Sequence, residues 1–192
     1  MHKYLPSYFV FLDQYNSFVF KNNSINIGII YRNYHNKNRE TELYKIASAC
    51  KQKKFKLYIS NSIKLALKFK ADGVYVPAFN KSKRYNNLEK RNLLIIGSAH
   101  NQKEIQEKKM QSCSAIFLSP LFYIKKRKDY LNICKFNILS INNNIRFFAL
   151  GGISEKNISK LKLLNINGFG GISLFKKKPA CKRPVFSKNN FF

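Results

Sequence analysis

Two adjacent glycines in the last third of the chain have the type and spacing needed to bind an anion. Gly151 and Gly152 directly follow Phe147–Leu150, an apolar run with the composition of a strand. A Gly-Gly pair in this position lets backbone N–H groups approach an anion, because no Cβ stands in the way. Such turns also occur where nothing binds, so the pair alone leaves anion binding and a simple turn equally open.

A second apolar run, Gly170–Phe175, follows the first at a distance that leaves room for a helix. The intervening residues Asn157–Leu164 place apolar side chains at helical spacing. Strand, turn, helix and strand make a βαβ unit, and in barrels built from such units the loops after strands seven and eight often hold a phosphate. We therefore predict a phosphate-binding cup formed by Gly151-Gly152 and Ile172-Ser173.

The elements that must position this cup are short apolar runs that alternate with helical patterns. The runs predict eight strands, at Tyr8–Leu12, Ile25–Tyr31, Phe55–Ile59, Gly73–Val76, Asn92–Gly97, Ala115–Leu118, Phe147–Leu150 and Gly170–Phe175. Helices are predicted over Glu42–Lys53, Ser62–Phe69, Gln102–Met110 and Asn157–Leu164. Continuous apolar runs suit parallel strands that are covered on both faces. The sequence therefore predicts an α/β fold, a short or trimmed (β/α)8 TIM barrel.

The alternative fold is an open, doubly wound sheet. No GxGxxG motif follows the first strand, which argues against a dinucleotide site of that fold. The length of 192 residues suits one domain, although it is below the usual size of a TIM barrel. We expect the barrel to occupy residues 1–178 and a basic tail to occupy residues 179–192.

The net charge of +27 raises the question of polyanionic partners. It arises from 36 basic and 9 acidic residues, and the lysines are scattered along the chain. Only 7 of the basic residues are Arg, whereas proteins that bind nucleic-acid backbones usually rely on Arg. We therefore interpret the charge as compositional and do not expect nucleic acid as a partner.

The cysteine pattern and the hydropathy bear on the compartment. The four cysteines show no CxxC spacing, and the three histidines lie far apart, so neither a zinc site nor a disulfide framework is predicted. The apolar run Tyr8–Leu12 is too short to span a membrane. These features predict a cytoplasmic protein without a membrane partner, and they leave the oligomeric state open.

Function in a parallel barrel collects at the carboxyl ends of the strands. The residues at or near these ends are Asp13, Arg32, Ser60, Asn61, Asn80, Ser98, His100, Ser119, Gly151, Gly152, Ile172 and Ser173, and all of them except Ile172 are polar or glycine. A polar group after every strand is more than ordinary loops require. We therefore expect these residues to surround one site.

Six segments in this order resemble the thiamine phosphate synthase and TenI superfamily of (β/α)8 barrels. They are YR (31–32), ISNSIKLALKFKADGVYVP (59–77), IIGSAHN (95–101), FLSPLF (117–122), FFALGGI (147–153) and GFGGIS (168–173). The resemblance implies a role in thiamine biosynthesis. It implies a transferase that joins a pyrimidine diphosphate to a thiazole phosphate and expels pyrophosphate with the help of Mg²⁺.

The resemblance also implies roles for individual residues. Gly151-Gly152 and Ile172-Ser173 match the cup for the thiazole phosphate, and Arg32 matches an arginine that binds the diphosphate. Ser98 and His100 match the active-site serine and histidine after strand five. The implied partners are therefore phosphorylated thiazole and pyrimidine molecules.

Several positions depart from the family pattern. Asn61 and Asn80 stand where the family has the acidic ligands of Mg²⁺, so both carboxylates are replaced by amides and a bound Mg²⁺ is doubtful. Asn61 remains a candidate for contact with the diphosphate. Tyr75 replaces a histidine after strand four, and Tyr34 replaces a lysine near Arg32.

Two hypotheses accommodate these departures. In the first, the basic segment Lys125, Lys126, Arg127 and Lys128 supplies part of the charge of the missing metal. In the second, the chain resembles a TenI-type tautomerase, in which His100 shuttles a proton on a thiazole carboxylate phosphate, although the acidic partner of that histidine is Asn33 here. A barrel that binds a phosphorylated ligand without catalysis is the third alternative.

Overall fold

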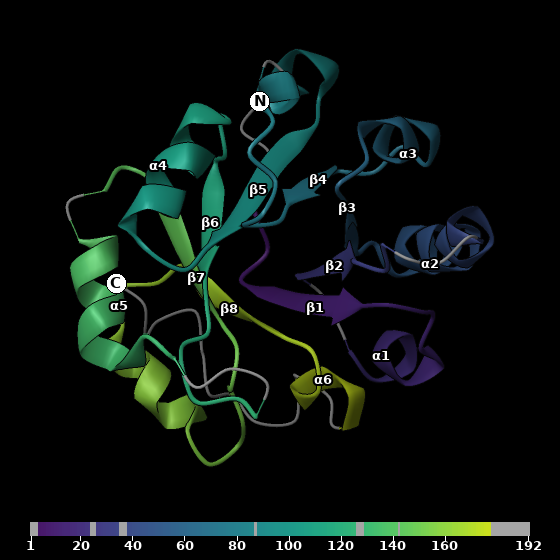
Figure 1. Ribbon diagram of the computed structural model, residues 1–192. Coiled ribbons are helices and arrows are strands. Elements are labelled where there is room, and N and C mark those ends of the chain that lie inside the picture. Colours follow the sequence, from purple (N-terminus) through teal and green to yellow (C-terminus); the bar gives the residue numbers. More distant parts are fainter. Residues whose placement is uncertain are drawn as a thin grey trace.

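Eight parallel strands close into a barrel in the order of the chain (Figure 1). The computed structural model describes residues 4–23, 26–34, 38–86, 88–125, 129–141 and 143–177. Its strands are β1 (Tyr8–Leu12), β2 (Ile27–Tyr31), β3 (Lys56–Ser60), β4 (Gly73–Val76), β5 (Leu94–Ala99), β6 (Ala115–Leu118), β7 (Arg146–Leu150) and β8 (Gly168–Gly171). Each strand pairs with the next, and β8 closes the barrel on β1 through the register Tyr8↔Phe169. The prediction of an eight-stranded (β/α)8 barrel is confirmed.

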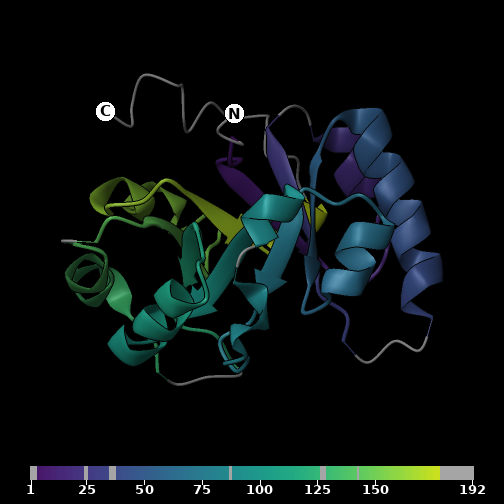
Figure 2. The same ribbon diagram turned by 90° about the horizontal axis from the view of Figure 1, so that it is seen from above.

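Helices stand outside the strands in both views (Figures 1 and 2). The α-helices are α1 (Ser17–Asn22), α2 (Arg39–Lys53), α3 (Ile63–Lys68), α4 (Gln102–Met110), α5 (Asn132–Ser140) and α6 (Leu174–Lys177). The described residues also form three short 3₁₀ helices, η1 (Lys83–Tyr85), η2 (Leu88–Arg91) and η3 (Ile158–Leu163). No helix in the described part of the chain is long and apolar enough to cross a membrane.

The eighth strand ends earlier than the sequence predicted. The prediction extended it to Phe175, whereas β8 ends at Gly171 and Phe175 belongs to α6. The reason is packing: the ring of Phe175 stacks on that of Phe169, with centroids 5.9 Å apart, and the chain must turn at Ile172-Ser173 to bring it there. Those two residues therefore lie in a turn after the strand.

Other elements differ from the prediction in type or extent. The predicted α-helix over Asn157–Leu164 is the 3₁₀ helix η3, and α1 and α5 were not predicted. α1 did have a signal, because the side chain of Asn16 caps it by accepting a hydrogen bond from the backbone N–H of Phe18 at 3.0 Å. Ile25 and the proposed tail over residues 179–192 lie outside the described residues.

Aromatic rings fill the interior of the barrel. Phe117 and Phe148 both stand edge-on to Phe9, with ring centroids 5.1 Å away in each case. Gly28 makes room for Phe9, because a Cβ at this glycine would lie 2.5 Å from the Phe9 ring. The interior is thus a packed core, as in other barrels of this kind. A ligand must therefore bind above it, at the ends of the strands.

This buried interior leads to a prediction about alkaline stability. Burial raises the pKa of the phenols of Tyr58 and Tyr75, and it raises the pKa of the Cys113 thiol to about 12. When the folded pKa of a group lies above the unfolded one, its stabilising contribution is complete below the unfolded pKa and is lost as the pH rises toward the folded one. We expect the free energy of unfolding to fall above about pH 8.5 through Cys113, and more steeply above about pH 10 through the tyrosines.

Urea unfolding at several pH values from neutral to strongly alkaline measures this decline. In Tyr58→Phe the decline should be shallower by up to about 1.4 kcal/mol for each pH unit above the unfolded tyrosine pKa. A free energy of unfolding that stays constant to about pH 11 would contradict the prediction.

Candidate functional site

A cavity of about 660 Å³ lies at the carboxyl ends of the strands. Its walls come from the ends of β1, β2, β4, β5, β6 and β7 and from the start of α4. They consist of Asp13, Arg32, Asn33, Tyr34, Tyr75, Pro77, Ala78, Phe79, Ser98, His100, Glu104, Ser119 and Leu150. The structure thus brings Arg32, Ser98 and His100 together around one space, although they are far apart in the sequence.

Arg32 is held at the cavity wall by the carboxylate of Asp13. The Nε and Nη2 atoms of Arg32 lie 3.4 and 3.5 Å from the two oxygens of Asp13. The guanidinium also lies over the ring of Phe11, 6.0 Å from its centroid. These long contacts and a side chain that is 34% exposed leave N–H groups of Arg32 available to an anionic ligand.

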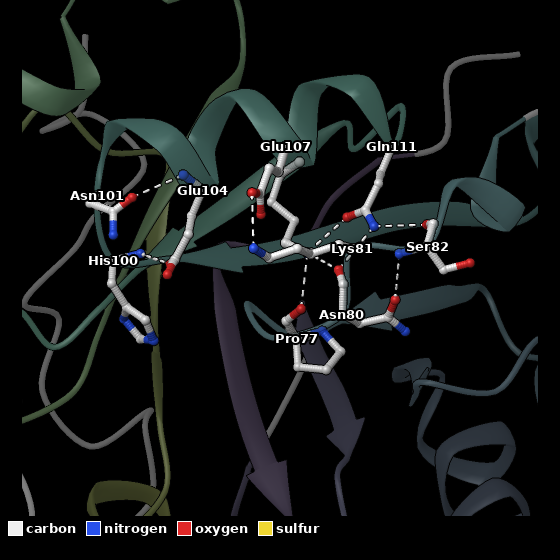
Figure 3. Close-up of polar contacts among 10 residues, drawn as sticks. Pro77, Asn80, Lys81, Ser82, His100, Asn101, Glu104, Glu107 and Gln111 are labelled. Carbon is white, nitrogen blue, oxygen red and sulfur yellow. Dashed lines mark hydrogen bonds and ion pairs between the residues drawn. The ribbon is translucent and has the colours of Figure 1, made fainter.

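His100 has a defined tautomer. Its Nδ1 donates a short hydrogen bond to the carbonyl oxygen of Ser119, and since a carbonyl can only accept, Nδ1 carries the proton. Its backbone N–H donates to Oε2 of Glu104 at 2.7 Å, and Asn101 caps α4 at the same turn (Figure 3). In the neutral imidazole the remaining ring nitrogen, Nε2, is the basic one, and it is the atom that can take a proton from a ligand.

Ser98 connects two strand ends. Its hydroxyl accepts a hydrogen bond from the backbone N–H of Ala78 at 3.0 Å and also bonds to the phenol of Tyr75. Both Ser98 and Tyr75 are almost completely buried. The serine thus fixes the loop after β4 against β5.

The two asparagines at the predicted metal positions bind each other. The Oδ1 atom of Asn61 accepts hydrogen bonds from the hydroxyl of Tyr85, at 3.0 Å, and from the side-chain amide of Asn80. The Oδ1 atom of Asn80 accepts from the backbone N–H of Ser82 at 2.9 Å. Mg²⁺ is usually bound through one or two carboxylates, and neither of these residues has a carboxylate. This pair does not fit a Mg²⁺ site.

The predicted phosphate cup lies beside the cavity. Gly151 and Gly152 have φ angles of +90° and +72°, which only glycine adopts easily, and a Cβ at Gly152 would lie 2.6 Å from the carbonyl oxygen of Phe122. The Gly-Gly turn therefore has a packing reason of its own. The turn at Ile172-Ser173 follows the neighbouring strand, with Ser173 exposed.

None of these four cup residues is among the described residues that line the cavity, although Leu150, which precedes them, is. Lys125 is exposed and is likewise not among the described residues that line the cavity. The rest of the basic segment, residues 126–128, falls outside the described residues. Over the described ranges, no three His, Cys, Asp or Glu side chains are grouped so that they could hold a metal.

An aromatic pair at the cavity was missed by sequence reasoning. The rings of Tyr34 and Phe79 meet edge to face, with centroids 5.8 Å apart, and both line the cavity. The hydroxyl of Ser60 donates to that of Tyr34 at 2.9 Å, and burial raises the pKa of the Tyr34 phenol. The available signal was position alone, because each of the two aromatic residues lies three residues beyond the end of its strand.

The model of the thiamine monophosphate synthase family matches residues 23–175 of the chain. A thiamine-phosphate synthase of Prochlorococcus marinus is 31% identical over 128 residues, which are 65% of this chain and 37% of that protein. A protein of Aquifex aeolicus, provisionally named thiamine-phosphate synthase 2, is 31% identical over 147 residues, which are 71% of this chain and 77% of that protein.

The fold has a matching solved structure. Thiamine phosphate pyrophosphorylase from Pyrococcus furiosus superposes with a TM-score of 0.70 over 97% of this chain and 93% of that one, at 16% identity. The chain spans little more than a third of the length of the Prochlorococcus relative. The family match covers all the strand ends from β2 to β8. The chain therefore belongs to the thiamine monophosphate synthase family.

Proposed function

We propose that this chain works in thiamine biosynthesis as a thiamine phosphate synthase. It joins hydroxymethylpyrimidine diphosphate to thiazole phosphate and releases pyrophosphate. The observation that carries the proposal is the meeting of Arg32, Ser98 and His100 in the wall of one cavity at the strand ends, in a chain of this family. The relatives from Prochlorococcus marinus and Aquifex aeolicus both carry the name thiamine-phosphate synthase, which supports the same reaction.

The proposed reaction breaks one bond and forms another. The bond between the pyrimidine methylene carbon and the diphosphate oxygen breaks, and its electron pair leaves with pyrophosphate. The thiazole nitrogen then donates its lone pair to the carbon. The protein must stabilise the departing anion and hold the thiazole phosphate in line with the cation.

The residues of the chain suit these tasks. The guanidinium of Arg32, held by Asp13, offers a fork of N–H groups to the departing pyrophosphate. The backbone at Gly151-Gly152 suits the thiazole phosphate, because the two neighbouring strand ends of β7 and β8 bring both turns to the same side. The aromatic pair Tyr34 and Phe79 offers flat surfaces for a ring.

The geometry of His100 favours a second candidate, a thiazole tautomerase. In that reaction the free Nε2 removes a proton from the thiazole carboxylate phosphate and returns it to another atom of the same molecule. No second substrate is consumed and no pyrophosphate is released. The two activities are therefore separable with the same purified protein.

The deciding experiment supplies the two phosphorylated halves and measures pyrophosphate release with a coupled assay. Release that requires both halves supports the synthase. If NMR shows that the protein converts the thiazole carboxylate phosphate alone, the tautomerase is the correct function and the synthase proposal is wrong. Stabilisation by thiazole phosphate without either reaction would indicate a binding protein.

Replacing His100 with alanine distinguishes the two enzymes further. The synthase reaction requires no proton transfer when the thiazole nitrogen attacks, so we expect pyrophosphate release to fall by less than about tenfold. A tautomerase would lose its only base, with a decrease of about 10²–10⁴-fold. Thermal unfolding of the variant checks that the loop around Ser119 keeps its fold. If pyrophosphate release fell as much as the tautomerase activity is expected to fall, His100 would take part in the synthase reaction and this expectation would be wrong.

A further inference from the structure

The loop after β4 is wrapped around the ammonium group of a buried lysine. Lys108 lies on α4, and its residue is 0% exposed. Its Nζ lies 2.9 Å from the carbonyl oxygen of Pro77, 2.7 Å from that of Asn80 and 2.8 Å from Oε1 of Gln111. Figure 3 labels these three partners. All three partners are neutral oxygen atoms.

These contacts define the charge of Lys108. Carbonyl and amide oxygens can only accept hydrogen bonds, and three acceptors require three N–H donors, which only the protonated ammonium provides. Burial lowers the pKa of Lys108 from its ordinary value, as expected for a charge removed from water, while Glu107 and Glu104 oppose the shift. The protein thus carries an internal cation beside this loop.

Gln111 adds two further hydrogen bonds to the same loop. Its Nε2 donates to the carbonyl oxygens of Asn80, at 2.9 Å, and Ser82, at 2.8 Å. Outside this group, Lys81 pairs with Glu107 at 3.4 Å, which ties the same loop to α4 a second time. Three side chains of α4 and its C-terminal end, Glu107, Lys108 and Gln111, therefore hold the loop, with Lys108 at the centre.

Asn80 joins this cation to the strand ends. Its backbone carbonyl is bound by Lys108, and its side chain binds Asn61 after β3 and the hydroxyl of Tyr85. Arg84 adds a further positive charge, because its Nη2 lies 3.2 Å from the same hydroxyl. A divalent cation at Asn61 and Asn80 would have to break these hydrogen bonds, would find no carboxylate there, and would be repelled by two nearby cations.

We propose that this barrel has exchanged a divalent-metal site at the ends of β3 and β4 for a closed network centred on the ammonium of Lys108, and that it binds its ligands and turns over without a divalent metal. Only the part of this proposal that concerns turnover rests on the proposed function. Lys108 positions the loop whose residues Pro77, Ala78 and Phe79 line the cavity. It is a positioning residue and does not touch the reacting atoms.

The first test is metal binding by the protein without substrate. Mn²⁺ is titrated in and its free fraction is followed by electron paramagnetic resonance. We expect the wild-type chain to bind Mn²⁺ more weakly than about 1 mM, and Asn61→Asp/Asn80→Asp, which restores two carboxylates, is the matched comparison. Wild-type binding tighter than about 0.1 mM that is lost in Asn61→Ala/Asn80→Ala would overturn the proposal.

The second test is spectroscopic and concerns Lys108 itself. A buried ammonium with three acceptors exchanges its hydrogens slowly, so a ¹H–¹⁵N spectrum at neutral pH should show a protected side-chain NH₃⁺ signal. Lys108→Arg, which keeps the charge, should remove that signal from a folded protein. A spectrum without it would show that the network has no ammonium centre, and the proposal would be wrong.

The third test is turnover in the presence of a chelator. If pyrophosphate release occurs, we expect it to keep more than about half its rate in excess EDTA. Loss of turnover in EDTA, restored by Mg²⁺, would overturn metal independence. Absence of turnover under all conditions would contradict the proposed function. The Mn²⁺ and NMR tests would still decide whether the Lys108 network stands in place of a metal site.

Discussion

Replacing Arg32 with alanine is expected to lower pyrophosphate release at least about a hundredfold. The reason is that Arg32 is the guanidinium in the cavity wall, and negative charge develops there as the pyrophosphate departs. Removal of one preorganised donor to a developing anion typically costs 10²–10³-fold in rate. The measurement is the steady-state rate of pyrophosphate release with both phosphorylated halves.

Two further variants make the result specific. Arg91→Ala removes an exposed arginine of η2, and it should leave the rate unchanged within about twofold. Arg32→Lys keeps the charge and loses the fork, so its rate should lie between those of the wild type and the alanine variant. Equal rates for Arg32→Ala and Arg91→Ala would show that this guanidinium has no part in the reaction.

Replacing Lys108 with methionine is expected to lower the free energy of unfolding by about 2–4 kcal/mol. Methionine fills most of the volume of the side chain and leaves the carbonyl oxygen of Pro77 and Oε1 of Gln111 without their donor. A buried acceptor without a partner costs about 1–3 kcal/mol, and part of that sum is recovered because the variant no longer buries a charge. Urea unfolding at neutral pH, with the m-value compared, measures the change.

Lys103→Met is the matched control, because Lys103 is an exposed residue of the same helix. We expect its free energy of unfolding to change by less than about 0.5 kcal/mol. Lys108→Arg should recover part of the loss, since it restores donors but not the shape of the ammonium. If Lys108→Met were as stable as the control, the network around Asn80 would contribute nothing to the fold.

The barrel itself was predictable because each strand is an uninterrupted apolar run. Such runs are the pattern of strands covered on both faces, and the runs at Gly73–Val76 and Ala115–Leu118 have the same bounds in the structure. Strand ends were therefore located well, and with them Arg32, Ser98 and His100 of the cavity. The bounds were least accurate at β8, where small residues carry little hydrophobic pattern.

The hydrogen-bond network could not be predicted from the pattern of the chain. α4 reads QKEIQEKKM, in which Lys108 and the exposed Lys103 are both lysines beside a glutamate in a polar helix, so the sequence does not distinguish them. Its burial depends on the loop 77–82 folding back over it, which is a tertiary contact between residues about thirty positions apart. The roles of Asn61 and Asn80 were equally hidden, because an amide on its own does not reveal whether it binds a metal or another amide.

The pairing of β8 with β1 makes the order of synthesis matter for this chain. Seven strands can be made, and their helices formed, while β1 still lacks its second neighbour, because that neighbour begins only at Gly168. Until then the nascent chain presents two unpaired strand edges, β1 and β7, which are sites for pairing with other chains. A shortened chain that stops before Gly168 should therefore aggregate, and the full chain should depend on ribosomal or chaperone protection until its last strand is released.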